Sequence, residues 1–379
     1  MSPAYYTAAQ IFDGETVHRR SALVIASGQV EGIAPLAELP PEASVADLGE
    51  GIIAPGFVDL QVNGGGGVML NDDPSVSAIR TICEAHRPFG TTALLPTLIT
   101  DTPVNTAKAV AAAVEAERQG VSGFAGLHLE GPHLDPRRHG AHDPSLIRPM
   151  TNEDLRNLVA AKDKLRTLLT TVAPESVTTD QIATMAKAGI IVSIGHSDCS
   201  YDTAMRCFDA GATMVTHLFN AMSQLGNREP GLVGAALERQ SVSAGLIADG
   251  HHVHGASIRL ALKSKSGPGQ IFLVTDAMAT VGSAIQDFML NGRKILRSAG
   301  RLTLADGTLA GADIDMAASV ASVRELSGLN WIEALRMAAA APAKAISRGH
   351  EYGHLKPGCR AEFVCLSEQG RLVGTYPAL

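Results

Sequence analysis

Residues 57–67 read FVDLQVNGGGG, a short apolar run that stops abruptly at four glycines. Phe57, Val58, Leu60 and Val62 are typical of a buried strand, and the glycines allow the chain to turn tightly after it. The apolar runs that follow along the chain indicate which fold contains this strand.

Seven similar runs follow, separated by roughly 25–40 residues, a spacing that leaves room for a helix between strands. The eight predicted strands span residues 57–62, 92–98, 124–130, 167–173, 190–196, 214–219, 244–248 and 271–275. Alanine-rich stretches with helical periodicity lie between them, for example 104–120 and 178–189. Alternating strands and helices imply parallel strands joined by crossover helices. Eight such units predict an α/β fold, a TIM-like (β/α)8 barrel. A doubly wound open sheet is the alternative, because the pattern does not establish closure.

The two ends of the chain have a different character. Residues 1–54 and 353–379 read as short strands and turns, and we expect them to form one small β-sandwich domain beside a barrel of residues 55–352. Within 288–312, Asn291-Gly292 and Asp306-Gly307 are hairpin signals, so this stretch is predicted to be an insertion after the eighth strand.

Composition narrows the classes of function. The formal net charge of the 379 residues is −7 and no Lys/Arg run occurs, which argues against nucleic-acid binding. No apolar run of about 18 residues and no signal peptide are apparent, so we expect no membrane association. The five cysteines contain no C-x-x-C pair, which favours reduced thiols and a cytoplasmic protein.

Polar residues follow several predicted strands at the carboxyl end, where barrel enzymes carry their active sites. They are Glu130, His196, His217, Asp249, His251, His252 and Asp276. Each has an ordinary explanation when taken alone, as a helix cap or a core histidine. Together, Glu130, His196 and His217 form a carboxylate and two imidazoles, a set that binds Zn²⁺ or a similar divalent ion and leaves a position for water.

Asp276 would face such a water. A bound divalent ion lowers the pKa of its water toward about 7, so that a carboxylate can accept the proton at neutral pH. The same carboxyl can then deliver the proton to a leaving amine. Capping of the following helix is the alternative role of Asp276.

Longer motifs carry a resemblance that covers nearly the whole chain. They are PGFVDLQVNGGGG (55–67), GLHLEGPHL (126–134), IGHSDCSYD (194–202), THLFNAM (216–222), REPGLVGAAL (228–237), IADGHHVH (247–254), LVTDAMA (273–279) and DGTLAGAD (306–313). In this order the motifs resemble the N-acetylglucosamine-6-phosphate deacetylase family within the amidohydrolase superfamily. The resemblance implies hydrolysis of an N-acetyl group from an amino-sugar phosphate, in amino-sugar catabolism and cell-wall sugar recycling.

The resemblance also implies residue roles. Glu130, His196 and His217 match the metal ligands, and Asp276 matches the catalytic aspartate. The residues that match substrate-binding positions are His142, which meets the acetyl carbonyl, Asn220 and Ala221 through their backbone, Arg228 at the phosphate, His252 and Gly311. The family further implies a homodimer, in which Arg228 serves either its own site or that of the neighbouring subunit.

Gln61 and Asn63 stand where some members of this family carry His-x-His. Neutral amides replace imidazoles poorly as Zn²⁺ ligands. One divalent ion per subunit is therefore expected, with Zn²⁺ first and Fe²⁺, Mn²⁺ or Co²⁺ as alternatives. Gln61 either hydrogen-bonds the bound water or caps the mouth of the barrel.

Two other functions fit the residues. One is a different amidohydrolase, acting on a cyclic amide or another N-acetyl sugar phosphate. The other is a non-catalytic protein that binds a sugar phosphate as a sensor, against which the retained ligand set with Asp276 argues, since a sensor does not need a proton carrier.

Overall fold

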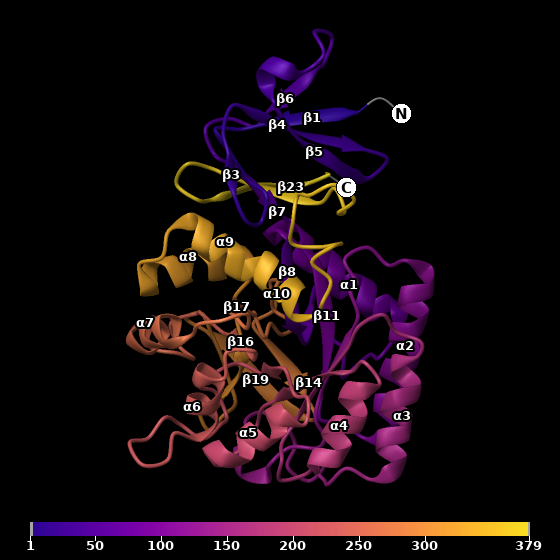
Figure 1. Cartoon of the computed structure of the whole chain (residues 1–379). Coiled ribbons are helices and arrows are strands. Elements are labelled where there is room, and N and C mark those ends of the chain that lie inside the picture. Colours follow the sequence, from indigo (N-terminus) through magenta and orange to yellow (C-terminus); the bar gives the residue numbers. More distant parts are fainter. Residues whose placement is uncertain (1–2, 378–379) are drawn as a thin grey trace.

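The computed structural model describes residues 3–377 and has a barrel with a smaller β-rich part stacked on one end (Figure 1). The barrel sheet contains eight parallel strands in the order β17-β16-β15-β14-β13-β12-β11-β8. Their bounds are β8 (Phe57–Val62), β11 (Thr91–Ile99), β12 (Leu127–Glu130), β13 (Leu168–Val172), β14 (Ile191–Ile194), β15 (Met214–Val215), β16 (Ser243–Leu246) and β17 (Ile271–Leu273). The predicted TIM-like fold is confirmed.

Helices cover the outside of the sheet, so that both of its faces are buried (Figure 1). They are α1 (Val76–His86), α2 (Pro103–Gln119), α3 (Asn152–Lys162), α4 (Thr179–Lys187), α5 (Tyr201–Asp209), α6 (Gly231–Glu238), α7 (Gly255–Ser264), α8 (Met316–Ser327), α9 (Trp331–Ala338) and α10 (Ala340–Ala345). Capping boxes begin α3 at Thr151 and α4 at Thr178, which satisfies backbone donors that the first helical turn leaves free. Among residues 3–377, no helix is both long and apolar enough to cross a lipid bilayer.

The barrel closes where β8 meets the segment after β17. The backbone N–H of Asp276 donates to the carbonyl of Gln61 at 2.9 Å, and Asn63 donates to Ala277 at 2.8 Å. Asp59, fully buried in β8, accepts a hydrogen bond from the Thr275 hydroxyl at 2.5 Å. Burial raises the pKa of Asp59 to about 7, although the bond from Thr275 opposes the shift. The first and last strands are thus joined by side chains as well as backbone.

Strands from both ends of the chain build the smaller part. One sheet contains β1 (Ala4–Thr7), β4 (Ser21–Ala26), β5 (Gln29–Pro35) and β6 (Val45–Asp47), and the other contains β2 (Gln10–Phe12), β3 (Val17–His18), β7 (Ile52–Pro55), β22 (Phe363–Leu366) and β23 (Leu372–Tyr376). Ile11, Leu23 and Phe363 share one apolar cluster, and Phe363 stacks on Tyr376 with ring centroids 4.8 Å apart. Because β22 pairs with β7, the C-terminal segment anchors the N-terminal one.

An antiparallel sheet is inserted after the eighth barrel strand. It comprises β18 (Asp287–Leu290), β19 (Arg293–Ser298), β20 (Arg301–Thr303) and β21 (Leu309–Ala312). Its buried residues Leu290, Ile295 and Leu302 pack in one cluster with Met69 and Met278. The glycine stretch after β8 forms a short hairpin, β9 (Gly64–Gly65) and β10 (Val68–Met69). The remaining short elements are 3-10 turns at Leu36–Glu38, Arg87–Phe89 and Pro136–Arg138.

We predict that Asp59→Ala destabilises the chain by about 2–4 kcal/mol, because the buried donors of Thr275 and Gln61 then lose their acceptor. Urea denaturation measures this change. Asp59→Asn, which keeps one acceptor oxygen, is the matched control and should lose less. An Asp59→Ala variant within about 0.5 kcal/mol of the parent would show that this contact does not secure the closure.

Candidate active site

A cavity of about 230 Å³ lies at the carboxyl end of the barrel strands. It contains nine of the ten residues that the sequence singled out for metal binding, catalysis and substrate binding. Its lining residues are Ile99, Glu130, Gly140, Ala141, His142, His196, His217, Asn220, Ala221, Ile247, His252, Asp276, Met278, Thr308, Leu309 and Gly311. The tenth predicted residue, Arg228, does not line the cavity.

Glu130, His196 and His217 converge within this cavity. Glu130 is the last residue of β12, and His196 and His217 follow β14 and β15. Oε1 of Glu130 lies 3.2 Å from Nε2 of His196 and 3.1 Å from Nε2 of His217, and the two nitrogens are 3.0 Å apart. Tetrahedral bonds of about 2.0–2.1 Å separate neighbouring ligand atoms by about 3.3–3.4 Å, so the spacing approaches that of a coordination shell.

The chemistry of these atoms also fits a cation. Nδ1 of His196 donates to the carbonyl of Arg138 at 2.7 Å, which leaves a lone pair on Nε2. Two imidazole nitrogens and a carboxylate oxygen this close repel one another unless a proton or a metal cation lies among them. Burial alone would raise the pKa of Glu130, but the hydrogen bonds with His196 and His217 hold it well below its usual value. An ionised carboxylate and two imidazole nitrogens suit Zn²⁺ and neighbouring divalent metals.

His142 also lies near the ligand set, with Nε2 4.0 Å from Oε2 of Glu130. By distance alone, Glu130, His142 and His196 form a possible metal group. The hydrogen bonds of His142 argue otherwise. Nδ1 of His142 accepts from the backbone N–H of Thr100 at 3.3 Å, and the Thr100 hydroxyl lies 2.8 Å away. Burial, then His196, lowers the pKa of His142 well below its usual value, so the ring is neutral and its proton is on Nε2. His142 therefore presents a donor, and the side chains best placed to hold a cation are those of Glu130, His196 and His217.

The amides of Gln61 and Asn63 donate hydrogen bonds to carboxylates. Nε2 of Gln61 lies 3.1 Å from each oxygen of Glu130 and 3.2 Å from Oδ1 of Asp276. Nδ2 of Asn63 donates to the same Asp276 oxygen at 2.7 Å. The pair thus connects the metal-ligand carboxylate with the aspartate beside it, which is more than the cap that the sequence suggested as one alternative.

Asp276 follows β17 at the closing seam of the barrel. Burial, and after it the Glu130 carboxylate, raises the pKa of Asp276 to about 6. The backbone of Asp276 has φ +51°, and His196 and His217 have φ +48° and +27°. In each case the left-handed turn directs a side chain into the cavity at the end of a strand, a conformation that L-residues seldom adopt.

The cavity is also lined by the other predicted substrate-binding residues, His252, Asn220, Ala221 and Gly311. Oδ2 of Asp249 holds Nδ1 of His252 at 2.7 Å, so Nε2 is free to meet a ligand. The N–H of Asn220 donates to the His217 carbonyl at 2.9 Å, which makes the N–H of Ala221 the better placed of the two for a ligand. Gly311 has φ +64°, and a Cβ there would lie 2.7 Å from the Asp276 carbonyl.

Arg228 lies outside this cavity. It is exposed in the 223–230 segment that precedes α6, and the described residues provide no ion pair for it. Within one chain, the guanidinium of Arg228 is therefore not among the groups that line the cavity.

Sequence reasoning missed Thr100, and it named Asn63 and Asp249 without giving them a supporting role. Thr100 sets the tautomer of His142 from the end of β11, Asn63 holds Asp276, and Asp249 orients His252. Only Asp249 carried a signal, because it stands three residues before His252 in a turn. Thr100 and Asn63 become meaningful only once the barrel brings distant strand ends together.

Several known proteins resemble this chain. Residues 52–376 match the amidohydrolase family. The N-acetylgalactosamine-6-phosphate deacetylase of Shewanella sp. is 40% identical over 87% of this chain and 83% of its own. The N-acetylglucosamine-6-phosphate deacetylase of Haemophilus influenzae is 35% identical over 96% of this chain and 95% of its own.

Solved structures agree with these sequence relatives. The N-acetylglucosamine-6-phosphate deacetylase of Pasteurella multocida superposes with a TM-score of 0.94 at 35% identity, over 99% of this chain and 98% of that one. A mutant of the Mycobacterium smegmatis enzyme, in complex with N-acetyl-D-glucosamine-6-phosphate, superposes with a TM-score of 0.90 at 32% identity, over 98% and 97%. The chain therefore belongs to the amidohydrolase family, in the branch that contains the N-acetylglucosamine-6-phosphate deacetylases.

Proposed function

We propose that this protein hydrolyses the N-acetyl group of N-acetylglucosamine 6-phosphate, giving glucosamine 6-phosphate and acetate. The observation that carries the proposal is the convergence of Glu130, His196 and His217 beside a buried Asp276 in one cavity. The names of the H. influenzae, P. multocida and M. smegmatis relatives support the substrate. The product amine and acetate would enter amino-sugar catabolism and cell-wall sugar recycling.

Glu130, His196 and His217 would hold one divalent metal ion in each subunit. Zn²⁺ suits this donor set best, and Fe²⁺, Mn²⁺ and Co²⁺ are alternatives. When bound, the ion lowers the pKa of a water and polarises the amide carbonyl. Gln61 occupies the strand position from which a second metal would be ligated, and it donates to Glu130 instead.

The remaining groups act through proton transfer and hydrogen bonding. Asp276 accepts a proton from the attacking water and then returns it to the leaving nitrogen of the sugar. Nε2–H of His142 donates to the carbonyl oxygen as negative charge develops there in the tetrahedral intermediate. Gln61 and Asn63 orient the Asp276 carboxylate through its Oδ1 atom, which keeps Oδ2 available for the proton.

The substrate's sugar and phosphate would contact His252, Asn220, Ala221 and Gly311, which also line the cavity. Arg228 would grip the phosphate through a bidentate guanidinium contact. Its exposed position on its own chain supports a homodimer in which each Arg228 reaches into the site of the neighbouring subunit.

The galactosamine epimer is a second candidate substrate. The Shewanella relative, at 40% identity, is named for N-acetylgalactosamine 6-phosphate. The reacting groups named above contact the N-acetyl end and do not distinguish the epimers. Rates on both sugar phosphates decide between them.

The cytoplasm is the compartment that we infer for this chemistry. All five cysteines lie within the described residues, and all are buried and unpaired. Unpaired thiols are typical of reducing compartments.

We predict that Asp276→Asn lowers kcat by about 10²–10⁴-fold, because the amide cannot accept the proton of the attacking water. Steady-state acetate release from N-acetylglucosamine 6-phosphate measures the loss. Asp180→Asn, at an exposed position in α4, is the control and should keep the parent rate. Turnover of the Asp276→Asn variant within a few-fold of the parent would show that another group carries the proton.

We predict about one tightly held divalent ion per chain, and its loss in Glu130→Gln, because a neutral amide replaces the carboxylate ligand. Metal analysis after gel filtration provides a readout that is independent of activity. Asn63→Gln, which leaves the three proposed ligands in place, should retain the ion. A Glu130→Gln variant with the metal content of the parent would remove Glu130 from the ligand set.

We predict that Arg228→Ala lowers kcat/KM for N-acetylglucosamine 6-phosphate by about 10²-fold, a loss of the size expected when a charge-assisted contact is removed. The rate on unphosphorylated N-acetylglucosamine should change little. Arg156→Ala, at an exposed position in α3, controls for loss of surface charge. Equal losses on the two sugars would refute the phosphate contact.

A further inference from the structure

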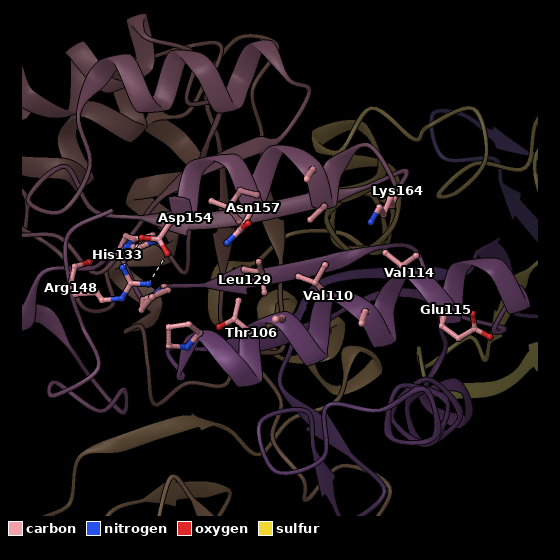
Figure 2. Close-up of a pocket in the computed structure, with 18 residues that line it drawn as sticks. Thr106, Val110, Val114, Glu115, Leu129, His133, Arg148, Asp154, Asn157 and Lys164 are labelled. Atoms are coloured by element: carbon pink, nitrogen blue, oxygen red, sulfur yellow. Dashed lines mark hydrogen bonds and ion pairs between the residues drawn. The ribbon is translucent and has the colours of Figure 1, made fainter. Parts of the chain in front are cut away.

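A second cavity of about 510 Å³ lies on the outside of the barrel, between helices α2 and α3 (Figure 2). Strand β12 forms its floor through Leu129. Its lining residues are Pro103, Thr106, Ala107, Val110, Ala111, Val114, Glu115, Leu129, Gly131, Pro132, His133, Arg148, Asp154, Asn157, Leu158, Ala160, Ala161 and Lys164. We refer to it as the α2–α3 groove. Of the residues of the catalytic cavity, none lines the groove.

The groove exists because small side chains face one another across it. Ala107 and Ala111 from α2 lie opposite Ala160 and Ala161 from α3, and none of them can fill the space between the helices. Val110, Val114, Leu129 and Leu158 supply apolar walls, as Figure 2 shows for three of them. A cavity of this size and lining is in the range that binds small organic molecules.

At one end of the groove, one ring nitrogen of the His133 side chain has no hydrogen-bond partner within residues 3–377. The His133 side chain is only 4% exposed. Its Nδ1 lies 3.0 Å from the carbonyl of Arg148, which can only accept, so Nδ1 carries the proton and Nε2 carries a lone pair. Burial lowers the pKa of His133, which keeps the ring neutral. The nearest ionic neighbour of Nε2 is Oδ2 of Asp154 at 4.0 Å, beyond hydrogen-bonding distance.

The surroundings of Nε2 determine what it could bind. Asp154 is already occupied, because its oxygens accept from the Arg148 guanidinium at 2.6 Å and from Thr151. A lone pair beside this carboxylate favours a hydrogen-bond donor and repels an anion. A ligand that fits here therefore carries an uncharged donor at one end and an apolar body that extends along the groove.

We propose that the α2–α3 groove is a binding site for an uncharged aromatic alcohol, whose hydroxyl donates to Nε2 of His133 and whose ring packs between Val110 and Leu158. The surface around the groove argues against a protein as the occupant. Large apolar side chains that the described chain exposes, such as Val104 and Leu260, do not line the groove. Its apolar surface is recessed instead of displayed on a rim, where a protein interface would need it.

The site is separate from the catalytic cavity although both use β12. Successive side chains of a strand point to opposite faces, so Leu129 faces the groove while Glu130 faces the metal-ligand cluster. The two sites therefore do not compete for the same space, and this inference does not depend on the proposed deacetylase activity.

Isothermal titration calorimetry of the full chain with 2-naphthol tests the proposal. We expect saturable binding at about one site per chain, because one groove offers one acceptor. The methyl ether 2-methoxynaphthalene keeps the rings but cannot donate, and it should bind about fivefold more weakly. Excess N-acetylglucosamine 6-phosphate should not displace 2-naphthol. No saturable binding, equal binding of the ether, or displacement by the sugar phosphate would overturn the proposal.

Two variants and one control variant test where the ligand binds. Ala111→Phe fills the groove and should reduce 2-naphthol affinity at least tenfold, whereas Lys108→Phe, an exposed α2 position outside the groove, should not. His133→Phe should abolish the difference between 2-naphthol and its ether. Melting temperatures and sedimentation velocity of each variant accompany the titrations. Undiminished binding to a folded Ala111→Phe variant, or a change in its oligomeric state that shows a second copy covering the groove, would overturn the proposal.

Discussion

Burial of the Glu130 carboxylate is the constraint on which the rest of the site depends. Its exposure is 1%, and an ionised carboxylate survives at that depth only if nearby groups satisfy it. His196, His217 and Gln61 all lie within 3.2 Å of it and come from three other strands. A (β/α)8 barrel supplies this convergence, because the carboxyl ends of all its strands meet at one mouth. The side chains proposed as metal ligands are therefore also the groups that compensate for the loss of water around this carboxylate.

The closing seam of the barrel serves the same centre. Asp59 and Thr275 join β8 to the end of β17 below the cavity, and the Asp276 N–H bonds the Gln61 carbonyl directly above them. The side chains of Gln61 and Asp276 meet on the cavity side of that junction at 3.2 Å. Fixing the seam therefore also fixes the distance between the carboxyl of Asp276, the proposed proton carrier, and the amide of Gln61.

Much of the fold followed from local pattern. Each of the eight apolar runs overlaps a barrel strand, because strands buried on both faces read as continuous apolar segments. Polar residues at the carboxyl ends of these runs marked the cavity. What required the structure was contact between distant residues. The tautomer of His142 depends on Thr100, 42 residues away, and the α2–α3 groove depends on which alanines face each other. Arg228 is expected at the phosphate only because the family resemblance implies it, and its own chain leaves it outside the cavity. Where a surface loop projects is not encoded in local periodicity.

The left-handed backbone at His196, His217 and Asp276 has a consequence for protein engineering. Residues other than glycine or asparagine in this conformation cost on the order of 1 kcal/mol each, which the surrounding packing must offset. The backbone strain therefore falls on the residues of the site. Selection for thermal stability alone would favour the removal of this strain. Glycine at any of these positions would remove the backbone strain, but it would also remove the functional side chain. Screens that select only for heat resistance are therefore expected to yield stable proteins without activity.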